Sequence, residues 1–238
     1  MRTVVISQPS YFPWVGMLEQ MRLADVFVIY DDVAFSKGSF ANRVQVKTGQ
    51  GVKWLTVPLE GMRLGQRIKE VHAANGLGWR RKHLATLAQA YAKAPHAGEM
   101  LGLAEDVLGG GASRLCELSV ASMKALSNYF EMEGPGEFHF ASSLGIGGHN
   151  SPRVLDIVKH FGGARYVTGH GARDYLDHAA FDAAGVRVEY LDYRKTPYPQ
   201  QHGPFTPHVS ALDLVANCGR AGRDVIASPA VYWKDFLK

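Results

Sequence analysis

The stretch Thr3-Val4-Val5-Ile6-Ser7-Gln8-Pro9-Ser10-Tyr11-Phe12-Pro13-Trp14 decides the fold that this sequence predicts. Residues 3–6 form a β-branched apolar run that is ended by turn residues, which is typical of a buried strand. Residues 16–24 follow with the apolar spacing of a helix face, so the predicted order is strand, loop, helix. Two prolines restrict the loop, and we expect its aromatic side chains to line a pocket. The alternative is that they only cover the edge of the sheet.

Strand and helix signals alternate along the rest of the chain. Residues 25–30 predict a second strand, and residues 35–58 predict strands that we expect to extend the same sheet. A helical pattern runs from about 78 to 132. Later strands are expected at 138–140, 165–168 and 186–190, and later helices at 151–160, near 175 and at 210–217. This alternation predicts an α/β fold with a mainly parallel central sheet, flanking helices and a helical middle segment. We expect a single domain over residues 1–238.

The composition excludes several classes of protein. Hydrophobic residues make up 46% of the chain, but the apolar runs are too short for a membrane-spanning helix, so we expect a cytoplasmic protein. The net charge of +4 is spread over short basic groups, which suits anionic small molecules, and we expect no nucleic-acid binding. Cys116 and Cys218 are expected to be buried thiols. The sequence predicts no metal site and identifies no cofactor.

Two acidic residues, Asp31 and Asp32, follow the second predicted strand. Ligands of open α/β sheets collect at the carboxyl ends of strands, so these side chains are candidates for the same site as the first loop. They could hold a divalent cation, orient a ribose or an amine, or act as a general base. Because adjacent residues of a strand point to opposite faces, we expect only one of them to enter a given site. A solvated turn is the alternative.

Polar and basic residues gather in three further places. One short segment could receive a phosphate or a carboxylate, although a solvated basic edge explains it equally well. Its residues are Lys37, Asn42, Arg43 and Lys47. On a predicted helix, Lys82 stands beside His83, where a cation would keep the imidazole neutral and available as a base. Gly169-His170-Gly171 follows a predicted strand and is similar to a phosphate-binding turn, but it matches neither the P-loop nor the dinucleotide fingerprint.

The order and spacing of several segments resemble the WbqC-like protein family. The segments are Gln8-Pro9-x-Tyr11-x-Pro13-Trp14, Asp25 to Phe35, Asn42-Arg43, Trp54 to Pro58, Trp79-x-x-Lys82-His83, Tyr166-x-x-Gly169 with Tyr175-Leu176, and Tyr198-Pro199-Gln200 with Phe205, Ser210 and Asp213. They cover nearly the whole chain. The resemblance adds Tyr175, Tyr198 and Gln200 to the candidate binding residues. The chain departs from the family pattern at Ser7, where we expect His, and at His149-Asn150, where we expect Lys-Thr.

The resemblance implies a place in bacterial O-antigen or related surface-polysaccharide biosynthesis. The leading hypothesis is a transferase that adds an acyl or aminoacyl group to the amine of a nucleotide-linked sugar. Candidate substrate-binding residues are Gln8, Tyr11, Trp14, Lys37, Asn42, Arg43, Lys47, Lys82, Gly169, His170, Tyr175, Tyr198 and Gln200. The candidate catalytic residues are Asp32, His83 and Asp31.

Two other hypotheses stay open. One is a nucleotidylyltransferase-like enzyme that uses ATP or CTP, which rests on the order strand, proline-containing loop, helix and later glycine-rich turn. The other is a binding or scaffold protein for a carrier-linked intermediate, in which the basic helix at 80–82 would meet an acyl carrier protein. A closed cleft with a buried Asp32 would favour catalysis, and a flat surface over Gln8 and Trp14 would favour the scaffold.

Overall fold

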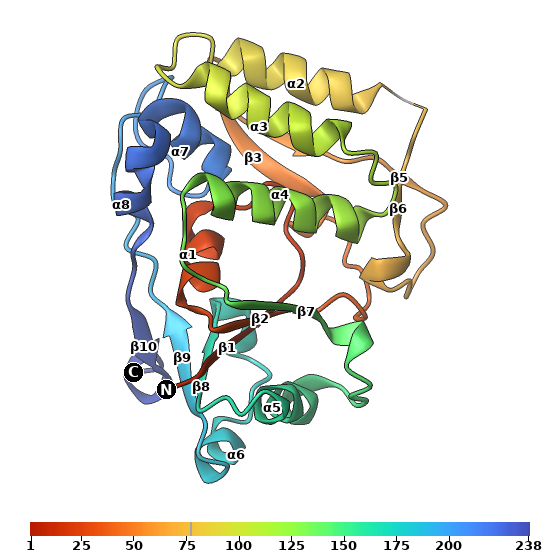
Figure 1. Cartoon of the computed structure of the whole chain (residues 1–238), viewed down its shortest axis with the longest axis vertical. Helices are drawn as coiled ribbons and strands as arrows, with labels where there is room; N and C mark the ends of the chain where they lie inside the picture. Colours follow the sequence, from red (N-terminus) through yellow and green to blue (C-terminus); the bar gives the residue numbers. More distant parts are fainter. Residues whose placement is uncertain (77) are drawn as a thin grey trace.

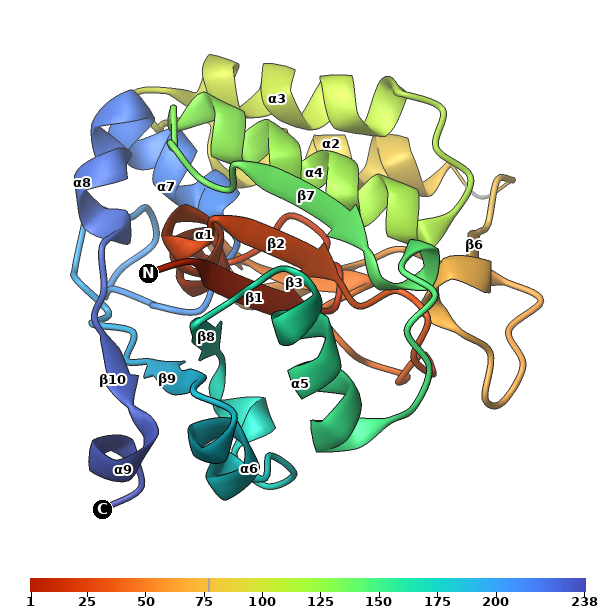
Figure 2. The ribbon, with the colours of Figure 1, turned by 60° about the horizontal axis from the view of Figure 1, so that its bottom comes forward.

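The computed structural model describes residues 1–76 and 78–238 and contains a six-stranded central sheet (Figure 1, Figure 2). The strands lie in the order β10-β9-β8-β1-β2-β7. Their bounds are β1 (Thr3–Ser7), β2 (Val26–Ile29), β7 (Glu137–Phe140), β8 (Arg165–Thr168), β9 (Arg187–Leu191) and β10 (Ala230–Tyr232). Neighbouring strands pair in parallel, apart from β10, which is antiparallel to β9. The predicted α/β class with a mainly parallel sheet is therefore confirmed.

Alternate residues of β1 face two separate apolar cores. Val5 belongs to the core that contains α1 (Val15–Leu23) and α4 (Leu115–Tyr129), whereas Val4 and Ile6 pack with α5 (Asn150–His160). A strand buried on both faces gives a continuous apolar run, which explains why residues 3–6 show no alternation.

The remaining helices cover the same two faces (Figure 1). On the side of α4 lie α2 (Trp79–Ala90), α3 (Ala97–Gly109), α7 (Ala211–Cys218) and α8 (Arg223–Ile226), and on the side of α5 lies α6 (His178–Ala183). The short 3₁₀ helices are η1 (Ile68–Glu70), η2 (Ala141–Ser143), η3 (His170–Ala172) and η4 (Gly219–Gly222). Among the described residues, no helix combines the length and the apolar character needed to cross a membrane.

The prediction that residues 35–58 extend the central sheet is wrong. The strands β3 (Arg43–Thr48) and β4 (Gly51–Thr56) pair with each other in a separate antiparallel sheet. A further small sheet joins β5 (Leu59–Glu60) to β6 (His72–Ala73). The strand that pairs with the outer edge of β2 is β7, which is more than 100 residues away in the sequence. The alternating pattern of residues 44–57 thus predicts a hairpin with one buried face, but it does not predict which sheet the hairpin joins.

The connections around β1 create a switch point in the sheet. From β1 the chain crosses through α1 to β2 on one side, and from β7 it crosses through α5 to β8 on the other side. The two crossover helices lie on opposite faces (Figure 2). The loops after β1 and β8 therefore diverge, and such a divergence leaves a crevice where open α/β proteins bind ligands.

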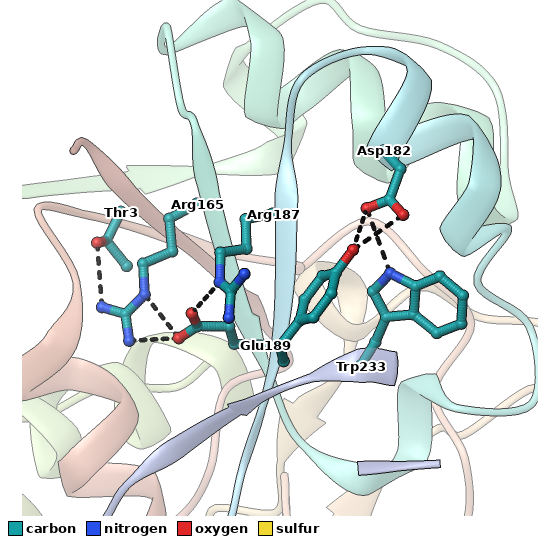
Figure 3. A network of polar contacts seen from close by, with 7 residues as sticks. Thr3, Arg165, Asp182, Arg187, Glu189 and Trp233 are labelled. Carbon is teal, nitrogen blue, oxygen red and sulfur yellow. Dashed lines mark hydrogen bonds and ion pairs between the residues drawn. The ribbon is translucent and has the colours of Figure 1, made fainter. Parts of the chain in front are cut away.

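The C-terminal segment closes the edge of the sheet at β9. In Figure 3, Asp182 of α6 accepts hydrogen bonds from the hydroxyl of Tyr232 at 3.0 Å and from the indole nitrogen of Trp233 at 3.3 Å. Glu189 of β9 forms an ion pair with Arg165 of β8 at 2.6 Å. The contacts of Asp182, with the antiparallel pairing of β10 and β9, hold β10 and α9 (Trp233–Phe236) on the sheet, so β9 presents no free edge to another chain.

The packing of α5 against β1 allows a test of the fold. Gly163 lies between them, and a Cβ atom there would come within 2.6 Å of Val4 Cγ2 and 2.9 Å of Val158 Cγ1. We expect Gly163→Ala to lower the free energy of unfolding by about 1–3 kcal/mol, measured by urea denaturation, because the core is overpacked. In the control, Gly102→Ala in α3, the added Cβ meets no described atom within 4 Å, and stability rises by up to about 1 kcal/mol. Equal stability of the two variants would contradict this packing.

Candidate functional site

A cleft of about 890 Å³ opens at the carboxyl ends of β1, β2 and β8. Its walls come from the loop after β1, the turn after β2, the start of α5 and the turn that contains η3. Its volume lies in the range of small-molecule sites. Six residues that the sequence singled out line the cleft, namely Gln8, Trp14, Asp32, Gly169, His170 and Tyr175.

The loop after β1 is held by burial of two of its three aromatic side chains. Tyr11 and Phe12 are 0% and 1% exposed, whereas Trp14 is half-buried and lines the cleft. Phe12 has a φ of 40°, in the left-handed region that bulky residues avoid. Its N–H donates to Ser122 Oγ and its carbonyl accepts from Ser210 Oγ, each at 2.8 Å. Tyr11 and Phe12 therefore anchor the loop, and Trp14 is the aromatic residue of the three that borders the cleft.

The neighbours Asp31 and Asp32 contact different parts of the molecule. Asp31 is buried and accepts hydrogen bonds from the N–H of Ser142 at 3.0 Å and from its hydroxyl at 2.7 Å. Asp32 lines the cleft and forms a bidentate ion pair with Arg153 of α5, with N–O distances of 2.9 and 2.6 Å. Of the two carboxylates, Asp32 alone lines the cleft. Because both of its oxygens accept from Arg153, its main effect is to orient that guanidinium.

Arg153 is the most prominent cleft residue that the sequence analysis missed. Its side chain is 8% exposed, and Nε donates to the carbonyl of Ile146 at 3.0 Å. The hydrogen bond to Asp32 raises the pKa of the guanidinium. One signal was available in the sequence: a cation in the first turn of a helix is unfavourable beside the positive end of the helix dipole, so it implies a nearby carboxylate.

Other missed cleft residues carry no such signal, because polar side chains of these types are common on any surface. They are Ser10, Gln20, Tyr30 and Thr168. Ser7 and Asn150, where the chain departs from the family pattern, also line the cleft.

Two α-helix N-termini and one short 3₁₀ turn border the cleft. Trp14 is the N-cap of α1, His149 is the N-cap of α5, and Gly169 precedes the three-residue η3. None of these three residues caps its helix with a side-chain hydrogen bond. The first N–H groups of a helix carry a partial positive charge, and an anion stabilises them. The cleft thus suits a ligand with at least one anionic group.

His170 has a fixed orientation at the edge of the cleft. Its Nε2 lies 3.0 Å from the carbonyl oxygen of Leu191, which can only accept, so Nε2 carries the proton in the neutral ring. Its ring packs against Phe236 of α9 with a centroid distance of 4.8 Å. Nδ1 is left with a lone pair, which makes His170 a possible proton acceptor.

His83 lies away from the cleft, in the core between α2 and the first loop. Its Nδ1 forms a hydrogen bond with the Tyr11 hydroxyl at 3.0 Å, and its ring packs on Trp79. Burial lowers the pKa of His83 to about 4, so the imidazole is neutral at pH 7 and supports the loop. Lys82 is exposed on α2 and is not among the residues that line the cleft.

Lys47, Tyr198 and Gln200 belong to a second buried network. Lys47 is 4% exposed and donates to Gln200 Oε1 at 3.2 Å and to the carbonyl of Gly203 at 2.9 Å. The amide of Gln200 donates to the hydroxyl of Tyr198 at 3.0 Å. Beside them, burial raises the pKa of Asp213. This network fixes the segment 198–206 on β3, and none of its members lines the cleft.

The other candidates lie just outside the cleft. Lys37 is exposed, and Asn42 is buried with its amide nitrogen bonded to a main-chain carbonyl at 3.2 Å. The guanidinium of Arg43 lies 4.1 Å from the centroid of the Trp54 ring. The residues between them, 38–40, do line the cleft, so this segment forms part of its rim.

The two cysteines, Cys116 and Cys218, are free thiols. Cys116 is buried, as expected, whereas Cys218 is half-buried. Burial raises the pKa of the Cys116 thiol to about 12, so it is a poor nucleophile. Within residues 1–76 and 78–238, no three His, Cys, Asp or Glu side chains gather as a metal-binding group.

Fold and cleft together define an α/β protein with a small-molecule crevice at the switch point of a parallel sheet. The model of the WbqC-like protein family matches residues 8–225, and the chain belongs to this family. The uncharacterized protein Rv1507c of Mycobacterium tuberculosis is 32% identical over 229 residues, which are 95% of this chain and 98% of that protein. No solved structure matches the chain significantly.

The burial of His83 predicts a pH dependence of stability. Its pKa is about 4 in the folded protein and about 6.5 in the unfolded chain, so protons bind preferentially to the unfolded state between these values. The free energy of unfolding should fall by about 3 kcal/mol from pH 7 to pH 4 on account of this residue and by only about 0.4 kcal/mol more below pH 4.

Urea denaturation of the wild type and His83→Gln over this pH range isolates the effect. We expect the stability difference between the two proteins to shrink as the pH falls, because the glutamine does not titrate. A constant difference from pH 7 to pH 4 would contradict a buried neutral His83.

Proposed function

We propose that the protein is a transferase that adds an acyl or aminoacyl group to the amine of a nucleotide-linked sugar, in bacterial surface-polysaccharide or related biosynthesis. The observation that carries this proposal is the cleft at the switch point, bordered by the N-termini of α1 and α5. A diphosphate is a natural ligand for such N-termini. Amide and hydroxyl groups from Gln8, Asn150 and Thr168 supply the hydrogen-bonding partners that sugar hydroxyls need.

The shape of the site supports catalysis over a scaffold. Asp32 is 13% exposed and lies in the same concave site as Gln8 and Trp14. A recess of this kind holds a small ligand on several sides, which a flat docking surface does not do.

His170 is the proton acceptor in this proposal. An attacking sugar amine bonds to the carbonyl carbon of an activated acyl donor, and the bond from that carbon to the carrier's thiol breaks. The amine proton passes to Nδ1 of His170 and from there to the departing thiolate. The bidentate ion pair of Asp32 with Arg153 holds the guanidinium at the cleft wall, where its remaining N–H groups can donate hydrogen bonds to the substrate. His83 and Asp31 support the loop and the strand end and take no part in this step.

A calorimetric screen against nucleotide-linked sugars tests the binding half of the proposal. Gln8 is exposed, lines the cleft and can be truncated without disturbing the core. We expect the wild type to bind at least one such sugar and Gln8→Ala to bind it about 3- to 10-fold more weakly, because one neutral hydrogen bond is lost. The matched control is Gln89→Ala, on the exposed side of α2, which should bind as the wild type does. Binding of no nucleotide-linked sugar would refute the proposal.

The catalytic half is tested by the release of free thiol from an acyl thioester in the presence of an amino-sugar nucleotide. We expect His170→Asn to lower kcat by about 100-fold or more with little change in KM, since it removes the proton acceptor and leaves the binding groups. His160→Asn, at the far end of α5, serves as the control. Full activity of His170→Asn would show that another group takes the proton.

A further inference from the structure

An exposed aromatic pair lies beside the mouth of the cleft. Phe40 and Trp54 are 47% and 40% exposed, and their ring centroids are 5.9 Å apart. Phe40 also lines the cleft, whereas Trp54 stands on β4 next to it. Large aromatic rings exposed together at the mouth of a pocket are costly in water unless they bind something. We refer to Phe40, Arg43 and Trp54 as the aromatic rim.

Arg43 adds a positive charge to this rim. Its guanidinium stacks over Trp54, and no carboxylate of the described residues lies within ion-pair distance of it. A Cβ atom on Gly38, which lines the cleft, would be 3.0 Å from a terminal nitrogen of Arg43. The cation is therefore held between the ring of Trp54 and the mouth of the cleft.

The same segment holds polar atoms without partners. Among the described residues, the buried side-chain atoms that lack a hydrogen bond are Ser39 Oγ, Asn42 Oδ1 and Arg43 Nε. All three fall within five consecutive residues, and Asn42 is only 7% exposed. Buried polar groups in folded proteins are nearly always paired, so these three atoms are open to an ordered water or a ligand.

We propose that the aromatic rim binds the nucleobase of the nucleotide-linked sugar, an inference that rests on the function proposed above. The flat rings of Phe40 and Trp54 suit base stacking, and Arg43 pairs with the adjacent phosphate. The inner cleft offers amide and hydroxyl groups and suits the sugar, whereas the rim offers rings and one cation. The nucleotide then lies with its base at the mouth and its sugar toward Asp32 and His170.

Calorimetry with two ligands tests this orientation. The first is the nucleotide-linked sugar that binds the wild type, and the second is the 1-phosphate of the same sugar, which has no base. We expect Phe40→Ala and Trp54→Ala each to weaken binding of the first ligand about 10-fold and to leave binding of the second unchanged. The control is Val52→Ala, which truncates another exposed apolar side chain on β4 and should change neither affinity.

Each outcome decides between the two proposals. If the nucleotide-linked sugar binds and neither aromatic variant weakens it, the rim does not hold the base, and the proposed function stands. If both ligands are weakened equally, the rim binds the sugar or its phosphate, and the inference is overturned. If no nucleotide-linked sugar binds the wild type, the proposed function fails and the inference fails with it.

Discussion

Burial of Tyr11 and Phe12 against α2 and α4 holds the loop after β1 in one conformation, and the cleft depends on that loop. The left-handed backbone at Phe12 costs about 1–3 kcal/mol. Full burial of its side chain contributes about 1.5–3 kcal/mol, and the hydrogen bonds with Ser122 and Ser210 contribute about 1 kcal/mol each. These contributions offset the strain of the left-handed backbone. Gln8, Ser10 and Trp14 are thereby presented to the cleft in fixed positions.

On the opposite wall of the cleft, the ion pair between Asp32 and Arg153 fixes the end of β2 and the start of α5. It joins the end of β2 to the first turn of α5, across 121 residues of sequence. A buried ion pair of this kind contributes little net stability, because desolvation offsets the attraction, whereas loss of one partner costs about 3–5 kcal/mol. The main effect of this ion pair is therefore to fix the position of the two side chains. It keeps a cation next to the N-terminus of α5, where the helix dipole alone would disfavour one.

Much of the fold could be predicted from the sequence because the relevant signals are local. The run at residues 3–6, the helix spacing after it and the later strand-helix alternation are each visible within a few residues. The partners of the strands are not local, which is why the hairpin at 43–56 was wrongly expected to join the central sheet. For the site, too, local signals could be predicted from the sequence and long-range contacts could not. Strand-end residues such as Gln8, Asp32 and Gly169 could be placed at one edge, but the burial of Tyr11 on His83 and of Lys47 on Gln200 depends on long-range packing.

The proposed ligand site is the crevice between the carboxyl ends of β1 and β8. A crystal structure of the protein with a bound nucleotide-linked sugar tests this location most directly. We expect the base at Phe40 and Trp54 and the sugar deeper in the crevice, within hydrogen-bond distance of Gln8 and with its amine beside His170. A ligand bound on the other side of the β2 terminus, in the pocket lined by Asp31, Arg114 and Cys116, would show that the crevice is not the binding site.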